Sequence, residues 1–291
     1  GTVTAMSAMI AGFVTNIVLD YLFVWVLPWG MTGAAVATVI GQAATFCVCL
    51  GYLVVKKQKP DFRFGGRAFR FAGKTLLLGL SPFGLAFSPN FMLIFVNFSA
   101  SAVGGQFALN CFAPVSYAIS VVLLLLQGVS DGCQPLVSRE FGSGSARGAR
   151  SVRNLAFAFA LVVAAVCMAV MFAVRRDISK VFGASDEVAA EVGNILPLFI
   201  AGFLFVGFSR IATAYFYATG NTWRAYIVIY GEPLCLLVLL LILPNFMGIT
   251  GTWLSVPLSQ ASLAVVAFLL VFLYDRGQRK REKNISTAEK A

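Results

Sequence analysis

An asparagine and an aspartate stand four residues apart inside the first apolar stretch of the sequence. Asn16 and Asp20 would share one face of a helix, because residues four apart are neighbours on a helix surface. A charge at the centre of a bilayer costs about 2.5–3.5 kcal/mol on insertion scales, and protonation or a polar partner lowers that cost. We therefore predict that Asp20 binds a proton or a cation reversibly, with the hydroxyl of Thr38 as a hydrogen-bond donor. Two alternatives stay open: Asp20 lies in water near the outer interface, and Thr38 bonds to its own helix backbone.

A second group of polar residues stands far along the chain. Arg210 and Glu232 lie in or near two neighbouring apolar stretches, so we expect them either to pair across two helices or to face a substrate. Gln127, Asp131 and Gln134 cluster at the end of another stretch, where they either line a vestibule or mark a solvated helix end. These five residues are the candidate substrate cavity.

The sequence lacks residues that many enzymes and cofactor sites need. It contains no histidine, which excludes a Ser-His-Asp triad and a His-based zinc site. Its six cysteines are scattered through apolar segments without a CxxC spacing, so they are predicted to be packing residues. The run Gly73-Lys74-Thr75 resembles the end of a phosphate-binding loop, but Ala68 occupies the position of the required glycine. We predict a protein that is not an enzyme, holds no cofactor or metal, and uses an ion gradient for any transport.

The elements that carry these residues are apolar enough to cross a membrane. Apolar residues make up 59% of the 291 positions and charged residues only 12%, against ~25% in a typical soluble domain. A bilayer core needs about 20 apolar residues per helix. Eight stretches qualify: 4–27, 31–55, 76–99, 107–129, 154–174, 193–218, 224–244 and 250–274. The predicted fold class is an all-α polytopic membrane protein with eight transmembrane helices, and a soluble enzyme is excluded.

Basic residues are distributed unevenly between the two ends of these stretches. The net charge is +10, and if eight helices alternate in direction, 18 basic residues lie on one side of the membrane and three on the other. By the positive-inside rule the basic side is cytoplasmic. Both ends of the sequence are therefore predicted to lie in the cytoplasm, in a multi-pass protein of the cell (inner) membrane. Basic residues placed this way indicate topology and not a nucleic-acid partner.

A short pattern recurs along the sequence at a fixed offset of 218 residues, in which Gly30, Thr32, Gly33 and Gln42 correspond to Gly248, Thr250, Gly251 and Gln260. The offset spans six predicted helices, as expected for two parallel repeats with a substrate site between them. We therefore predict four parts of the chain. Residues 1–55 are the last two helices of an N-terminal lobe, 56–75 a basic cytoplasmic linker, 76–275 a complete six-helix C-terminal lobe, and 276–291 a basic cytoplasmic tail. Four helices would then be missing before the first residue.

Several segments resemble the multidrug and toxic compound extrusion (MATE) family. Residues 16–20 and 30–38 are similar to the end of that family's N-terminal lobe, residues 128–144 to the link after its eighth helix, and residues 215–221 to the end of its tenth. The chain thus resembles a fragment that lacks the first four transmembrane helices. The resemblance implies a twelve-helix transporter whose two lobes flank a cavity, from which organic cations leave in exchange for H⁺ or Na⁺. It also implies that Asn16, Asp20 and Thr38 match an acidic network of the proton-coupled branch, whose other aspartate lies on a helix that this chain lacks.

The resulting prediction is secondary active efflux of small organic cations or other xenobiotics by a monomer in the lipid bilayer, by antiport with protons or sodium ions. One alternative is a lipid-linked oligosaccharide flippase of the same superfamily. Its cavity would need several cationic residues, and the sequence offers Arg210 and little more. A truncated membrane protein that transports nothing is the other alternative.

Overall fold

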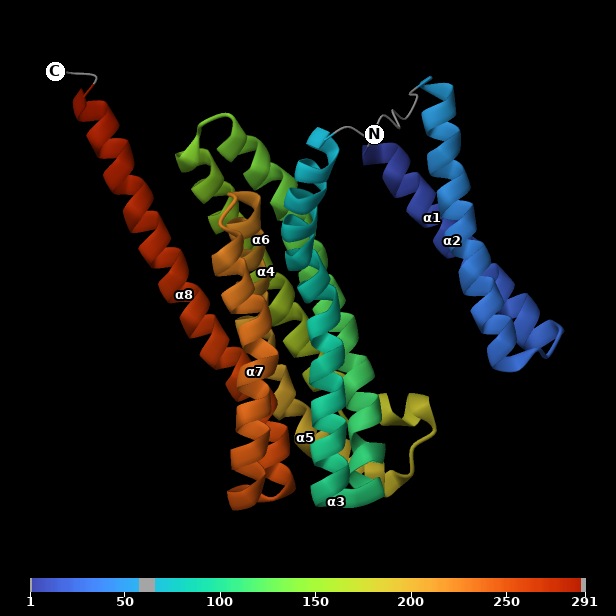
Figure 1. Ribbon diagram of the computed structural model, residues 1–291. Coiled ribbons are helices and arrows are strands. Elements are labelled where there is room, and N and C mark those ends of the chain that lie inside the picture. Colours follow the sequence, from blue (N-terminus) through green and yellow to red (C-terminus); the bar gives the residue numbers. More distant parts are fainter. Residues whose placement is uncertain (1, 58–65, 289–291) are drawn as a thin grey trace. The chain divides into compact units, whose positions relative to one another are not determined.

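The chain consists of two compact helical units. The computed structural model describes residues 2–57 and 66–288, in which every regular element is a helix (Figure 1). The units are Gly1–Phe69 and Arg70–Ala291. Among the described residues, six helices are long and apolar enough to cross a membrane, or seven if one bent pair forms a single span. The predicted all-helical membrane class is therefore confirmed.

The N-terminal unit is a pair of helices joined by a tight reversal. Helix α1 (Thr2–Asp20) continues directly into a short π-helix, η1 (Tyr21–Val26), and α2 (Gly30–Val55) returns beside it. At the reversal the amide of Trp29 donates to the carbonyl of Phe23 at 2.8 Å. The rings of these two residues stack with centroids 4.9 Å apart. The predicted stretches 4–27 and 31–55 therefore correspond to this pair.

Glycines let α1 and α2 approach closely. A Cβ atom added at Gly12 would lie 1.9 Å from Oγ1 of Thr45 and 2.6 Å from the carbonyl oxygen of Gly41. A Cβ atom at Gly41 would in turn lie 2.8 Å from the carbonyl oxygen of Gly12. In lipid, helices associate largely through such close van der Waals packing, because apolar side chains gain little by leaving apolar tails.

The C-terminal unit begins within the first turns of α3 (Gly66–Gly142), whose two arms run antiparallel. The chain reverses at Gly105, which has φ 60° and ψ −154°, a backbone conformation that essentially only glycine adopts. Figure 1 shows one arm descending in teal and the other returning in green. Residues of both arms line one cavity, among them Asn90 and Ser116, so the arms are neighbours. The predicted stretches 76–99 and 107–129 lie on these two arms.

Five further helices complete the C-terminal unit. They are α4 (Ala146–Val174), α5 (Asp186–Ile200), α6 (Phe203–Ala218), α7 (Thr222–Met247) and α8 (Ile249–Ala288), with a 3-10 turn, η2 (Ile178–Phe182), before α5. Serine caps begin two of them, because serine oxygens accept from free backbone amides of a first turn. Ser145 accepts from the amide of Gly148 at 3.0 Å, and Ser185 accepts from that of Val188 at 3.5 Å.

The predicted stretch 193–218 is bent and not a single straight helix. Helices α5 and α6 meet at an angle of 41°. Pro197 weakens the hydrogen bonding before the bend, because it has no N–H. At the bend, a Cβ atom on Gly202 would lie 1.9 Å from Oε1 of Gln260, so the glycine leaves room for this side chain of α8.

Small and hydroxyl residues pack beside large buried side chains such as Phe203 and Phe216 in the interior of the C-terminal unit, while many other large apolar residues face outward. Ala100, Ala164 and Ala212 are fully buried, and the hydroxyls of Ser99 and Thr252 hydrogen-bond to each other at 3.0 Å. By contrast, Phe98 and Leu124 are 79% and 72% exposed. This distribution is typical of a bundle in lipid, where small residues allow close helix contacts and the outer surface meets acyl chains.

Two of the predicted segments, the linker and the tail, can be compared with the structure in part. The linker 56–75 includes residues 58–65, which lie outside the described residues. The tail was predicted from residue 276, and α8 continues as a helix through this point to Ala288.

Candidate functional site

Two of the predicted polar residues of the N-terminal unit contact each other across the helix pair. The amide Nδ2 of Asn16 donates to the hydroxyl of Thr38 at 3.5 Å. That hydroxyl donates in turn to the carbonyl of Ala34, one turn earlier on α2, at 2.9 Å. Asn16 and Thr38 are therefore brought together, and the Thr38 proton is engaged by its own helix.

Asp20 occupies the junction between α1 and the π-helix η1. Its Oδ1 atom is buried, and no hydrogen bond to it is found among the described residues. The predicted donation from Thr38 to Asp20 is not formed, because the Thr38 hydroxyl donates to Ala34. The alternative of a backbone-bonded threonine is what the structure shows. A buried acceptor without a donor costs free energy, and π-helical turns are frequent at functional sites, so Asp20 remains the candidate ion-binding group.

In the C-terminal unit, Arg210 and Glu232 line the same cavity. This cavity, here called the central cavity, has a volume of about 160 Å³. Its polar lining comes from α3, α6, α7 and α8: Asn90, Ser116, Ser120, Arg210, Glu232 and Gln260. Among the described residues no ion pair joins Arg210 to Glu232. The predicted buried pair is thus not formed as a direct contact, and both charged side chains face one cavity.

Two prolines leave backbone carbonyls near Arg210 and Glu232 without their usual donors in the helix. Proline has no N–H, so it cannot donate to the carbonyl four residues before it in a helix. Pro89 leaves the carbonyl of Leu85 free, and Nη1 of Arg210 donates to it at 3.4 Å. Pro233 likewise frees the carbonyl of Ile229, which accepts from the hydroxyl of Ser88 at 3.5 Å. Helices α3, α6 and α7 are therefore linked through carbonyls that the prolines expose.

A second cavity adjoins the first and contains the predicted vestibule residues. Its volume is about 560 Å³, and Gln127, Asp131, Tyr217 and Arg210 line it. The amide Nε2 of Gln127 donates to Oδ1 of Asp131 at 2.7 Å. Gln134 lies one turn further along α3, half-buried, and does not line either cavity. Arg210 lines both, so it lies where the two cavities meet.

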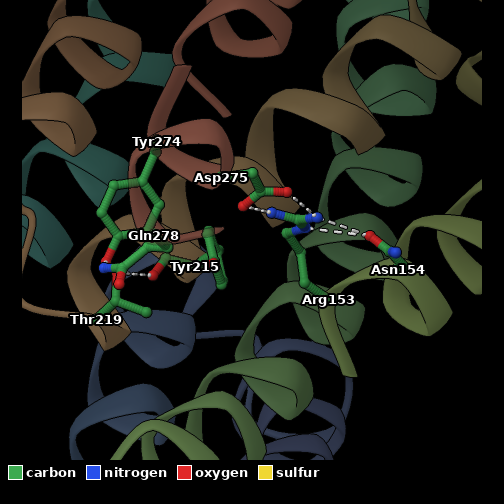
Figure 2. A network of polar contacts seen from close by, with 7 residues as sticks. All are labelled: Arg153, Asn154, Tyr215, Thr219, Tyr274, Asp275 and Gln278. Atoms are coloured by element: carbon green, nitrogen blue, oxygen red, sulfur yellow. Dashed lines mark hydrogen bonds and ion pairs between the residues drawn. The ribbon is translucent and has the colours of Figure 1, made fainter. Parts of the chain in front are cut away.

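A buried ion pair between α4 and α8 was not predicted from the sequence. Figure 2 shows Arg153 between Asp275 and Asn154. Its guanidinium donates to both oxygens of Asp275, at 2.8 and 2.9 Å, and Nη2 donates to Oδ1 of Asn154 at 2.8 Å. The same guanidinium lies 4.6 Å from the ring centre of Tyr215 on α6. This contact set holds three helices together at one end of the unit.

The remaining residues in Figure 2 extend this contact set. The ring of Tyr274 packs edge-on against Tyr215, with centroids 5.8 Å apart. The hydroxyl of Tyr274 accepts from Nε2 of Gln278 at 2.9 Å, and that of Thr219 donates to the carbonyl of Tyr215 at 2.9 Å. Among the described residues, His, Cys, Asp and Glu side chains form no group of three that could hold a metal ion.

Comparison with known proteins identifies relatives of this chain. The MatE family profile matches residues 85–242, which include Arg210 and Glu232. The multidrug export protein MepA of Staphylococcus saprophyticus is 23% identical over 278 residues, covering 93% of this chain and 60% of that protein. The MepA protein of Staphylococcus haemolyticus is 24% identical over 276 residues, with 93% and 60% covered. This chain thus spans about 60% of the length of the curated relatives it matches.

Solved structures show the same fold. The outward-facing structure of a multidrug resistance MATE family transporter of the MOP superfamily matches with a TM-score of 0.85 and 19% identity, covering 94% of this chain and 63% of that one. A MOP superfamily transporter from Pyrococcus furiosus matches with a TM-score of 0.78 and 19% identity, with 92% and 62% covered. At these identities the likeness concerns the fold.

Proposed function

Because the chain belongs to the MatE family, we propose that this protein exports organic cations and other xenobiotics by secondary active antiport with protons or sodium ions. The observation that carries the proposal is the position of the family match. Residues 85–242 supply most of the walls of the central cavity, including its two ionisable side chains. The names of the MepA relatives, which are multidrug export proteins, support the same activity.

The proposed topology has eight spans. The α1–α2 pair would be the last two helices of an N-terminal lobe, and the C-terminal unit would supply six spans if each arm of α3 crosses once and α5 with α6 cross together. Both ends of the sequence would then lie in the cytoplasm, where the basic residues gather. We propose that the protein is a monomer in the cell membrane.

Ion coupling is assigned to Asp20, with Asn16 and Thr38 beside it. The buried Oδ1 of Asp20 lacks a donor among the described residues, so a proton or a sodium ion bound there would satisfy it. Binding of the ion would also remove the charge that opposes burial in lipid. Because Asp20 stands where α1 becomes π-helical, ion binding would act on a type of helix turn that is frequent at functional sites.

The two cavities offer few cationic groups to bind the pyrophosphate of a lipid-linked oligosaccharide. Arg210 is the one basic residue among the described residues that line the two cavities. A pyrophosphate carries at least two charges, and proteins hold such groups with several charge-assisted hydrogen bonds. The cavity therefore favours the export proposal.

Ethidium efflux from cells that express the gene in full tests the proposal. We expect active efflux by the unchanged protein and its loss in Asp20→Asn, which removes the charge and keeps the shape. Asp177→Asn, the same change at an exposed position, should export normally. A protonophore or removal of sodium would identify the ion. Efflux by Asp20→Asn at the normal rate would refute the coupling role, and inactivity of the unchanged protein at normal expression would refute the export function.

A further inference from the structure

The central cavity contains one positive and one negative side chain, Arg210 and Glu232. Among the described residues, neither is in direct contact with an opposite charge. Arg210 is only 7% exposed, yet among the described residues its five N–H groups make one hydrogen bond, to the carbonyl of Leu85. Glu232 accepts no hydrogen bond from any described residue and forms no ion pair there. A buried guanidinium and a carboxylate both gain strongly from charge-assisted hydrogen bonds, so each is ready to bind an opposite charge.

We propose that the central cavity binds molecules that carry an anionic and a cationic group on one apolar body. The carboxylate or other anion of the ligand contacts the free N–H groups of Arg210, and its ammonium contacts Glu232. This inference rests on the proposed function and names a substrate class for it. A ligand with both charges satisfies both side chains at once, whereas a simple cation would leave Arg210 unpaired and close to a like charge.

The remaining walls suit the body of such a ligand. Phe112, Phe199 and Met92 supply apolar surface, and the rings of Phe112 and Phe199 have centroids 6.1 Å apart. Asn90 and Ser116 add neutral polar groups on the α3 arms. An aromatic or aliphatic body between two charged ends therefore fits the lining.

Binding of three matched probes to the purified protein in lipid nanodiscs tests the inference. 2-Naphthylalanine carries both charges, its methyl ester carries only the ammonium, and its N-acetyl derivative carries only the carboxylate. We expect naphthylalanine to bind at least about tenfold more tightly than either derivative, because a hydrogen bond to a charged group contributes about that factor. Equal binding of naphthylalanine and its methyl ester would overturn the inference.

Variants assign each charge to its partner. Arg210→Gln should abolish the preference over the methyl ester, and Glu232→Gln should abolish the preference over the N-acetyl derivative. Arg139→Gln and Glu187→Gln, the same changes at exposed positions outside the cavity, should keep both preferences. If Arg210→Gln fails to fold because Leu85 loses its donor, Arg210→Lys should retain the carboxylate preference, and Glu232→Gln still decides the other half.

Two further outcomes separate this inference from its alternatives. If the unchanged protein shows no preference and the double variant Arg210→Gln/Glu232→Gln is more stable than either single variant, the two groups are a structural pair bridged by water and the inference is wrong. Ethidium export in cells is scored separately from probe binding. Loss of export with the probe preference intact would refute the proposed function and leave the binding site in place.

Discussion

Arg153 and Asp275 illustrate how strongly burial affects the contribution of an ion pair to the stability of the protein. Their side chains are 5% and 14% exposed and meet through two parallel hydrogen bonds. The pair Asp177–Lys180 has the same 2.8 Å distance, but its side chains are 69% and 61% exposed. The hydrogen bond from Lys180 lowers the pKa of the Asp177 carboxyl, yet water and salt screen such a pair. The buried pair should therefore dominate stability.

Asp275→Asn is predicted to destabilise the protein by about 3–5 kcal/mol, because it leaves the Arg153 guanidinium buried without its counter-charge. The measurement is the thermal midpoint of the purified protein in detergent. Arg153→Met combined with Asp275→Leu should recover much of the loss, since no charge is then buried. Lys180→Gln should leave the midpoint unchanged. A neutral effect of Asp275→Asn would show that the pair contributes nothing to stability.

The contribution of the hydrogen bond between Ser88 and Ile229 to stability should depend on Pro233. Ser88→Ala is predicted to cost about 0.5–1.5 kcal/mol, because the carbonyl that Pro233 exposes loses its donor. In a Pro233→Ala background the new N–H of residue 233 can donate to Ile229, so Ser88→Ala should then cost little. A double-mutant cycle on thermal midpoints measures this coupling. Equal costs in both backgrounds would contradict the explanation.

At the scale of helices, some glycines are needed because two helices touch there, and others have open space around them. Gly12→Ala should weaken the α1–α2 pair, because its Cβ would overlap Thr45 and the Gly41 carbonyl. Gly51→Ala, also in this pair, is the matched control: no atom lies within 4 Å of its added Cβ, and alanine is the better helix former. We expect a lower thermal midpoint for the first variant and an unchanged or higher one for the second. The opposite order would mean that the two helices do not cross at Gly12.

For the whole molecule, the sequence predicted the helices better than their contacts. In lipid, backbone groups must pair within each helix, so long apolar stretches alone indicate the helices, although α3 contains two of the predicted stretches and α5 and α6 share one. Arg153 and Asp275 are 122 residues apart, and nothing in their spacing shows that α4 and α8 are neighbours. The sequence also contains Pro89, Pro233 and Arg210, but only packing shows which side chain reaches which freed carbonyl. Asn16 and Thr38 lie on a hairpin of two consecutive helices, yet the sequence suggested a hydrogen bond from Thr38 to Asp20 and not the one from Asn16 to Thr38.

The reversal at Gly105 decides how many times the chain crosses the membrane. A straight 77-residue helix would be about 115 Å long, nearly four times a bilayer core, so α3 must turn back within its length. In a protein whose native cysteines are replaced by alanine, Gln106→Cys and Val181→Cys should react with an impermeant maleimide in intact cells. Ser143→Cys should react only after permeabilisation, because the second arm of α3 would carry it to the cytoplasmic side. Labelling of positions 106 and 143 from the same side would rule out two spans in α3, and with them the eight-span topology on which the cytoplasmic assignment of both chain ends depends.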